Sequence, residues 1–201
     1  ELTAKPGIKV REDGDVDAAL EASARVIEAD FEFPFLAHGA MEPLDIAMMF
    51  DGETAEFWFA SQIPTIDHNV AATVLGIPFE KVKINTLWAG GSFGRRAQAD
   101  AHPVVEITTL AKAMQAAGMA PAPVKIVWTR EDDMAGGYYR PISAHRLRVG
   151  LDDQGNVTAF KYNIAAKSIV KGTPFEAMLM KDGVDHNMTE GAHDTTYAFP
   201  L

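Results

Sequence analysis

A glycine-rich stretch in the middle of the chain is the residue pattern that points most directly to chemistry. It consists of Gly90, Gly91, Ser92, Phe93 and Gly94, and Arg95 follows it. Because glycine has no Cβ atom, the backbone N–H groups of such a loop can approach a ligand closely and hold an anionic group. The stretch is neither a Walker A loop nor a dinucleotide fingerprint, because the residues that define those motifs are missing. The alternative is a tight turn with positive φ angles, which the glycine cluster taken alone favours.

Phe93 is the one large side chain within this glycine cluster. A bulky aromatic ring gains more free energy from burial than from exposure to water. We therefore expect the loop to pack against the rest of the fold with the Phe93 ring buried.

Histidines are the next candidates for a functional site. Four of them could in principle meet at a metal: His38, His68, His102 and His145. No H-x-x-x-H or H-E-x-x-H pair occurs, so the sequence favours histidines that are hydrogen-bonded within the fold over a metal held directly by the protein. A hydrolase is also disfavoured, because the chain has neither a G-x-S-x-G elbow nor a cysteine nucleophile.

Two charged segments lie in the second half of the chain. Arg140 follows Gly136, Gly137 and two tyrosines, and its guanidinium could bind a carboxylate or a carbonyl. The alternative for Arg140 is an ordinary surface turn. The cluster from Arg130 to Asp133 is typical of a solvated loop or a helix-capping sequence.

The elements that must position these residues alternate between hairpins and single helices. Apolar periodicity predicts helices over residues 16–29, 66–75 and 102–117, and strands over 44–50, 54–60, 82–88, 124–128, 147–151 and 157–164. Asp51-Gly52 predicts a hairpin turn, and Gly76 with Pro78 predicts the end of a helix. A strand, the glycine loop, a helix and a strand thus follow one another in the middle of the chain. The expected fold class is α+β, with mixed or antiparallel sheets and a few packed helices.

Composition narrows the classes of partner. The chain has 201 residues, a formal charge of −10 and no cysteine. An acidic chain without a long basic run is a poor match for nucleic acid or an anionic membrane, so a small molecule suits it better. No transmembrane segment is expected, and the piece should be soluble, but its compartment, bacterial cytoplasm or periplasm, stays open. Iron–sulfur ligation within these residues is excluded, because that chemistry needs cysteine.

Five motifs occur in an order that is specific in combination. They are Phe35 to Pro43, Ser61 to Pro64, Gly90 to Arg96, Trp128 to Met134 and Tyr139 to Pro141. Together they resemble the first molybdopterin-binding domain of the molybdenum hydroxylases, the superfamily of xanthine dehydrogenase and aldehyde oxidoreductase. The endings of the third and fourth motifs are most similar to the isoquinoline 1-oxidoreductase β-subunit branch. We expect a lead-in segment and helix over 1–30, the molybdopterin-binding domain over 31–170, and a loosely matched, partly flexible segment over 171–201.

The resemblance implies an enzyme that hydroxylates an aldehyde or N-heterocycle with oxygen from water. The implied cofactor is molybdopterin cytosine dinucleotide with molybdenum, and the implied partners are a small iron–sulfur subunit and a second molybdopterin-binding domain of the same full-length chain. By position, Gln62 would hydrogen-bond the cofactor, residues 90–95 would line it, and Arg140 would orient the substrate.

Ala97 stands where purine-oxidising members carry a glutamate, which disfavours a purine substrate. The general-base glutamate of the family belongs to a later segment, so we assign no catalytic residue to this chain and expect it to be inactive alone. The alternative is a non-catalytic binding or assembly module that retains the fold.

Overall fold

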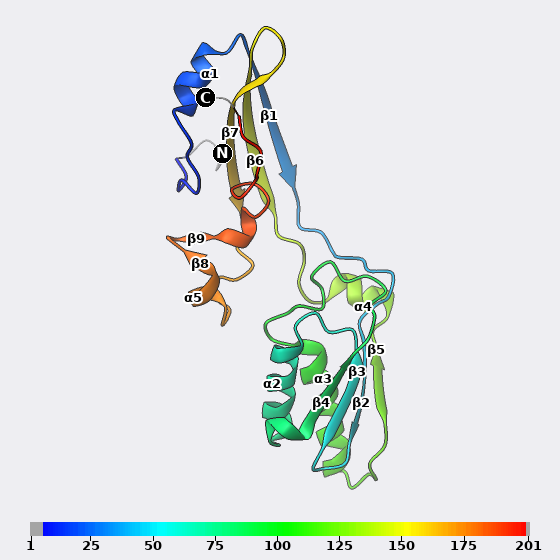
Figure 1. Cartoon of the computed structure of the whole chain (residues 1–201). Coiled ribbons are helices and arrows are strands. Elements are labelled where there is room, and N and C mark those ends of the chain that lie inside the picture. Colours follow the sequence, from blue (N-terminus) through cyan, green and yellow to red (C-terminus); the bar gives the residue numbers. More distant parts are fainter. Residues whose placement is uncertain (1–5, 200–201) are drawn as a thin grey trace. The chain divides into compact units, whose positions relative to one another are not determined.

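The computed structural model describes residues 6–199, which form two compact units (Figure 1). One unit is continuous, Ala37–Arg140, and the other joins the described residues up to Leu36 with those from Pro141 onward. The boundaries expected at residues 30 and 170 do not coincide with these units, because the strand that begins at Arg25 pairs with one that begins at Ser143. A pairing this distant in sequence leaves no local signal in composition or periodicity.

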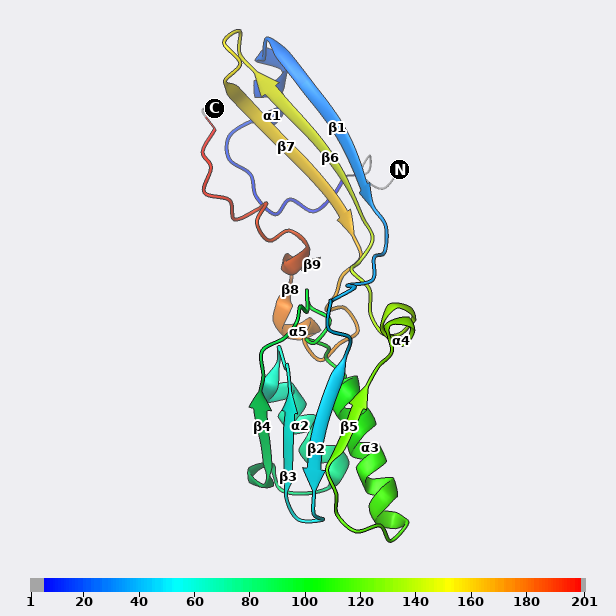
Figure 2. The same ribbon diagram turned by 90° about the vertical axis from the view of Figure 1, so that its right-hand side faces the viewer.

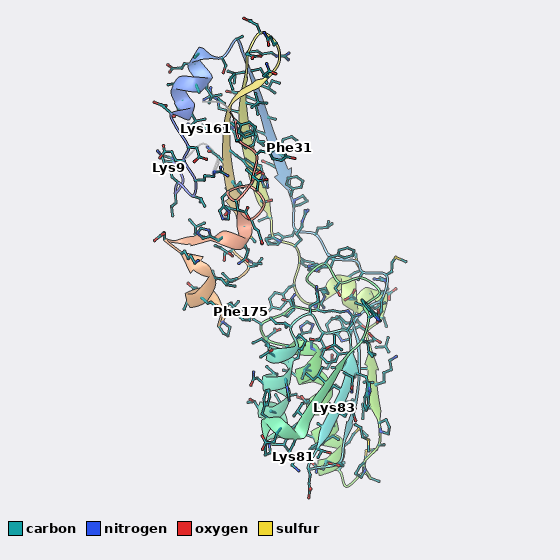
Figure 3. The ribbon with its side chains drawn as sticks, viewed as in Figure 1. Lys9, Phe31, Lys81, Lys83, Lys161 and Phe175 are labelled. Carbon is teal, nitrogen blue, oxygen red and sulfur yellow. The ribbon has the colours of Figure 1, made fainter. Side chains whose placement is uncertain are left out.

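A four-stranded mixed sheet is the centre of the continuous unit. Its strands are β2 (Asp45–Phe50), β3 (Ala55–Phe59), β4 (Val82–Thr86) and β5 (Val124–Val127), in the spatial order β4-β3-β2-β5 (Figure 2). β2 and β3 form the predicted antiparallel hairpin, whereas β3 and β4 run parallel. Lys83 of β4, labelled in Figure 3, donates to Glu56 of β3 at 2.6 Å.

Two long helices cover one face of this sheet. They are α2 (Pro64–Leu75) and α3 (His102–Ala116), and two short helices, η2 (Phe79–Lys81) and α4 (Arg130–Ala135), complete the unit. Alternate residues of β2 and β3 are buried, as expected for strands with one covered face. Gly76 ends α2 with φ 73° and an N–H bond to the Ala72 carbonyl at 2.9 Å, which confirms the predicted stop signal.

The other unit is built on a three-stranded antiparallel sheet. Its strands are β1 (Arg25–Phe33), β6 (Ser143–Leu151) and β7 (Val157–Ala166), in the order β1-β6-β7, and α1 (Val16–Ala22) packs on it. Lys161 of β7, labelled in Figure 3, donates to Asp17 of α1 at 2.6 Å. The helix predicted over 16–29 is therefore wrong beyond Ala22, because the following β-branched residues pair with β6 instead.

The segment after β7 contains four short elements. They are α5 (Glu176–Leu179), β8 (Met180–Lys181), β9 (Val184–Asp185) and η3 (His186–Met188). The buried carboxylate of Asp185 accepts the Ser168 hydroxyl at 2.6 Å and the Ile169 N–H at 3.0 Å, and so fixes this segment to the end of β7. None of the helices in the described part of the chain is long and apolar enough to cross a membrane.

Candidate functional site

The glycine loop follows β4 and presents a row of backbone donors. Its backbone has positive φ at Gly91 (98°), Phe93 (56°) and Gly94 (95°). Within residues 6–199, the N–H groups of residues 91–94 donate to no other protein atom. Consecutive N–H groups of this kind, in loops that alternate between left- and right-handed conformations, are suited to binding anionic or acceptor-rich groups. The loop therefore has the donor chemistry of a binding site.

Phe93 does not have the environment expected for it. Its side chain is 76% exposed, so the prediction that the ring is buried is wrong. The buried positions next to the loop are occupied by the side chains of Arg95 and Arg96 instead. Trp88, predicted to lie in the preceding strand, comes after it and is 100% exposed.

Glu42 braces the start of the loop. Its carboxylate accepts the N–H of Gly90, and its own N–H donates to the Gly90 carbonyl at 3.1 Å. A Cβ atom on Gly90 would lie 2.7 Å from Cβ of Glu42, so this close approach requires glycine. Glu42 also lies 3.4 Å from Nη2 of Arg96, which connects the brace to the end of the loop.

Arg96 connects the loop to Gln62. The N–H of Arg96 donates to Oε1 of Gln62 at 3.1 Å, and the N–H of Gln62 donates to the Arg96 carbonyl at 3.4 Å. Because a backbone N–H can donate only to the amide oxygen, this contact fixes which way the Gln62 amide points. Its Nε2 group then has no acceptor among the described residues and is a pre-oriented donor beside the loop.

The Arg95 side chain lies beneath the loop rather than at its surface. Only 3% of it is exposed, with Nε 3.4 Å from the Asp133 carboxylate and Nη1 3.0 Å from Nε2 of His102. Gly137 passes so close that a Cβ there would lie 2.6 Å from Nη2 of Arg95, and the guanidinium lies 5.3 Å from the Trp128 ring. Arg95 therefore anchors the loop through its side chain.

Burial and the Arg95 charge together lower the pKa of two histidines, His38 and His102. Both are therefore neutral at pH 7 and do not add positive charge beside Arg95. His68 bonds the Phe79 carbonyl at 2.9 Å, and His145 lies in the other unit, where it contacts the Tyr162 hydroxyl at 2.6 Å. Among residues 6–199 no three acidic or histidine side chains form a group that could hold a metal ion.

Three further residues singled out from the sequence are Ser92, Ala97 and Arg140. The Ser92 hydroxyl oxygen is buried and has no hydrogen-bond partner within the described chain. Ala97 and Arg140 are exposed, and Arg140 is the last residue of the continuous unit. Sequence reasoning missed Glu42, Arg96 and Asp133, although all three stand inside the motifs that carried the resemblance, because no local pattern shows which charged side chains pair with one another in the fold.

A second concave region of the same unit has the wrong charge for an anionic ligand. This depression of about 460 Å³ is lined by Asp100, His102, Glu106, Trp128, Gly137 and Tyr138. Its carboxylates are already engaged, since Asp100 accepts the Tyr138 hydroxyl at 2.9 Å and Glu106 accepts Nε1 of Trp128 at 2.8 Å. The glycine loop with Gln62 is therefore the better candidate for binding a phosphate-bearing cofactor.

Comparisons with known proteins identify relatives of this chain. The chain is 28% identical to the molybdenum-binding subunit of an aldehyde oxidoreductase from Escherichia coli K12 over 165 residues, 82% of this chain and 22% of that protein. It is 29% identical to the isoquinoline 1-oxidoreductase subunit beta of Brevundimonas diminuta over 147 residues, 72% of this chain and 18% of that protein. The chain thus spans about a fifth of the length of these relatives.

Solved structures give the same fold. Quinoline 2-oxidoreductase from Pseudomonas putida 86 matches with a TM-score of 0.57 and 20% identity, over 74% of this chain and 18% of that one. The expected α+β fold is thereby confirmed. The sequence family described as the molybdopterin cofactor-binding domain matches residues 3–189, which confirms the resemblance inferred from the ordered motifs. The chain belongs to this molybdopterin cofactor-binding domain family.

Proposed function

We propose that this chain supplies the first half of the molybdopterin site in a molybdenum hydroxylase that oxidises an aldehyde or an N-heterocycle with oxygen from water. The observation that carries the proposal is the pairing of Gln62 with Arg96, which holds a free amide donor next to the donor row of residues 91–94. When bound, the cofactor would supply the oxidation–reduction chemistry, and these protein groups would orient it.

The donor set suits the ligand. A pterin with its phosphate groups presents many hydrogen-bond acceptors, and the site offers the loop N–H groups, the Ser92 hydroxyl and Nε2 of Gln62. Arg95, first expected to contact the cofactor, would instead anchor the loop, because its side chain is buried against Asp133 and its N–H donates to the Ser92 carbonyl at 2.9 Å. Arg140 would orient the substrate from the end of the same unit.

Three finer features of the proposal rest on the family relationship. The cofactor would be the cytosine dinucleotide form, the other half of its site would come from a second molybdopterin-binding domain, and electrons would leave through iron–sulfur clusters on a partner subunit. An aldehyde or N-heterocyclic substrate is supported by the names of the relatives, an aldehyde oxidoreductase subunit and an isoquinoline 1-oxidoreductase subunit. Ala97, in place of a glutamate, argues against purines.

Gln62→Glu in the full-length enzyme separates the two roles of this side chain. Glutamate keeps an oxygen for the Arg96 N–H but replaces the free donor with an acceptor, so the loop should persist while the cofactor contact is lost. We expect kcat to fall by about 10- to 100-fold, the range for losing one hydrogen bond to a charged or reacting group.

Gln154→Ala, an exposed glutamine in the other unit, is the control and should leave kcat unchanged. Wild-type kcat and molybdenum content in Gln62→Glu would contradict the proposed site. That outcome would favour a binding or assembly module that retains the fold without the chemistry.

A further inference from the structure

A buried acidic side chain lies directly behind the turn that carries Gln62. Asp67, in the first turn of α2, is 3% exposed, and its carboxylate accepts the Ser61 hydroxyl. The Ser61 oxygen in turn accepts the N–H of Ile63 at 3.2 Å. The residues on both sides of Gln62 are thus connected to Asp67: Ser61 directly through its hydroxyl, and Ile63 through the same hydroxyl.

The other side of Gln62 is held by the loop. Arg96 contacts it twice, through its own N–H and through its carbonyl oxygen, as described above. The turn is therefore clamped from two directions: Asp67 and Ser61 fix its backbone from within the fold, and Arg96 fixes its amide from the loop. Two constraints on one short segment leave the Gln62 amide little freedom to rotate.

Burying the Asp67 carboxylate lowers the stability of the fold, and starting helix α2 does not require it. An exposed capping side chain at Ile63 would serve that purpose, yet the α2 N-terminus has no side-chain cap. A buried carboxylate that forms no ion pair within hydrogen-bonding distance costs stability through desolvation. The other charged residues that line the same small cavity, about 10 Å³ in volume, are Asp45, Arg95 and Arg96.

We infer that Ser61 and Asp67 are positioning residues that set the Gln62 amide for its contact with the cofactor. The inference rests on the proposed role of Gln62, but the geometric claim can be tested in the chain itself. If the clamp acts as inferred, loosening the turn at Ser61 must loosen the Gln62 contact with the Arg96 N–H on the far side.

Amide hydrogen exchange, followed by NMR on residues 1–201, measures that coupling. Ser61→Ala should speed exchange at the Arg96 N–H by about tenfold, roughly the effect of one lost hydrogen bond, while core amides of α3 keep their relative rates. Asp67→Asn tests the same link without removing the hydroxyl, and Ser61→Thr should restore slow exchange. The control is Leu75→Ala, which removes a buried side chain from the same helix and should affect Arg96 only as much as it affects the core amides.

The loaded full-length enzyme gives the second readout. Ser61→Ala should lower kcat by about tenfold with KM changed less than twofold and molybdenum content intact, because the cofactor is held but its amide donor is displaced. Unchanged Arg96 exchange in both Ser61→Ala and Asp67→Asn would overturn the positioning role whatever the kinetics. Coupled exchange together with a fully active Gln62→Glu enzyme would instead overturn the proposed role of Gln62 and leave the clamp standing.

Discussion

Two adjacent arginines show how a residue's type can suggest one role and its burial another. Arg95 and Arg96 end the glycine motif, where a basic side chain suggests a ligand contact. Both are instead buried, Arg95 against Asp133 and Arg96 against the segment that contains Glu42 and Asp45. Their positive charges position the loop, and the loop's own backbone offers the donors.

Asp67 makes the stability of the chain depend on pH in a defined window. Burial raises the pKa of its carboxyl from 3.8 to about 6. The folded chain therefore binds this proton more tightly than the unfolded chain does, and the resulting stability is fully present below about pH 3.8 and lost as pH rises through about 6.

Asp67→Asn should remove that dependence. Between about pH 4.5 and 7.5, the wild type should lose about 2 kcal/mol of unfolding free energy relative to Asp67→Asn, since one pKa unit corresponds to about 1.4 kcal/mol. Urea unfolding of both proteins at the two pH values measures the difference. A difference that stays constant across this range would show that Asp67 ionises normally.

Arg140→Lys tests the proposed orientation of the substrate. Lysine keeps the charge but loses the planar, two-pronged donor geometry of the guanidinium, so kcat/KM for the natural substrate should fall by about tenfold in the full-length enzyme. Arg25→Lys, an exposed arginine on β1, provides the matched control. Identical kinetics for Arg140→Lys and the wild type would contradict the substrate role and favour an ordinary surface turn at Arg140.

At the scale of elements, the sequence correctly predicted turns and helix ends, which depend on the backbone conformation of a few neighbouring residues. Asp51-Gly52 predicted the β2–β3 hairpin, and Gly76 predicted the end of α2, because both depend on backbone conformations within a few residues. The helix over 16–29 failed where pairing with β6 overrides helical periodicity. Asp182-Gly183, both at positive φ, forms the turn of the β8–β9 hairpin within the segment over 171–201, for which the sequence predicted no hairpin.

The candidate site was predictable only in part for a similar reason. Gln62 and Arg96 are hydrogen-bonded although they lie 34 residues apart in the sequence. Both residues belong to the ordered motifs that carried the resemblance. The contacts that join them are hydrogen bonds of the Arg96 backbone, and the loop that presents this backbone is held by buried arginine side chains. A sequence pattern does not distinguish buried charges from exposed ones. The exposed ring of Phe93 was missed because burial of a loop side chain depends on what else occupies the space beneath the loop.

The link between the loop and α4 predicts a specific weakness. Asp133 is the carboxylate closest to the buried Arg95 guanidinium, so Asp133→Asn leaves that charge without a counter-ion. Breaking a buried pair by removing one partner costs about 3 kcal/mol or more. Urea unfolding should show this loss of unfolding free energy in Asp133→Asn. Glu131→Gln changes an exposed carboxylate on the same helix and should alter the free energy of unfolding by less than about 0.5 kcal/mol. Equal effects of the two variants would exclude Arg95 as the anchor.

At the scale of the whole molecule, the chain is one part of a larger proposed site. It spans about a fifth of its relatives' length, and the free donors of residues 91–94 and Gln62 face no acceptor within the described residues. A half-site that lacks several charge-assisted hydrogen bonds, at about 1.5 to 3 kcal/mol each, would bind the cofactor weaker by many orders of magnitude. The isolated chain should therefore fold, yet show no hydroxylase activity.

The molybdenum content of the purified isolated chain, compared with that of the full-length protein expressed in the same cells, tests the central claim most directly. We predict essentially no molybdenum in residues 1–201 and about one molybdenum per full-length chain, because the second half of the site is needed to hold the cofactor. Near-stoichiometric molybdenum in the isolated chain would show that the site is complete within it. A full-length protein without molybdenum, purified from cells that load a known molybdenum hydroxylase, would contradict the proposed function itself.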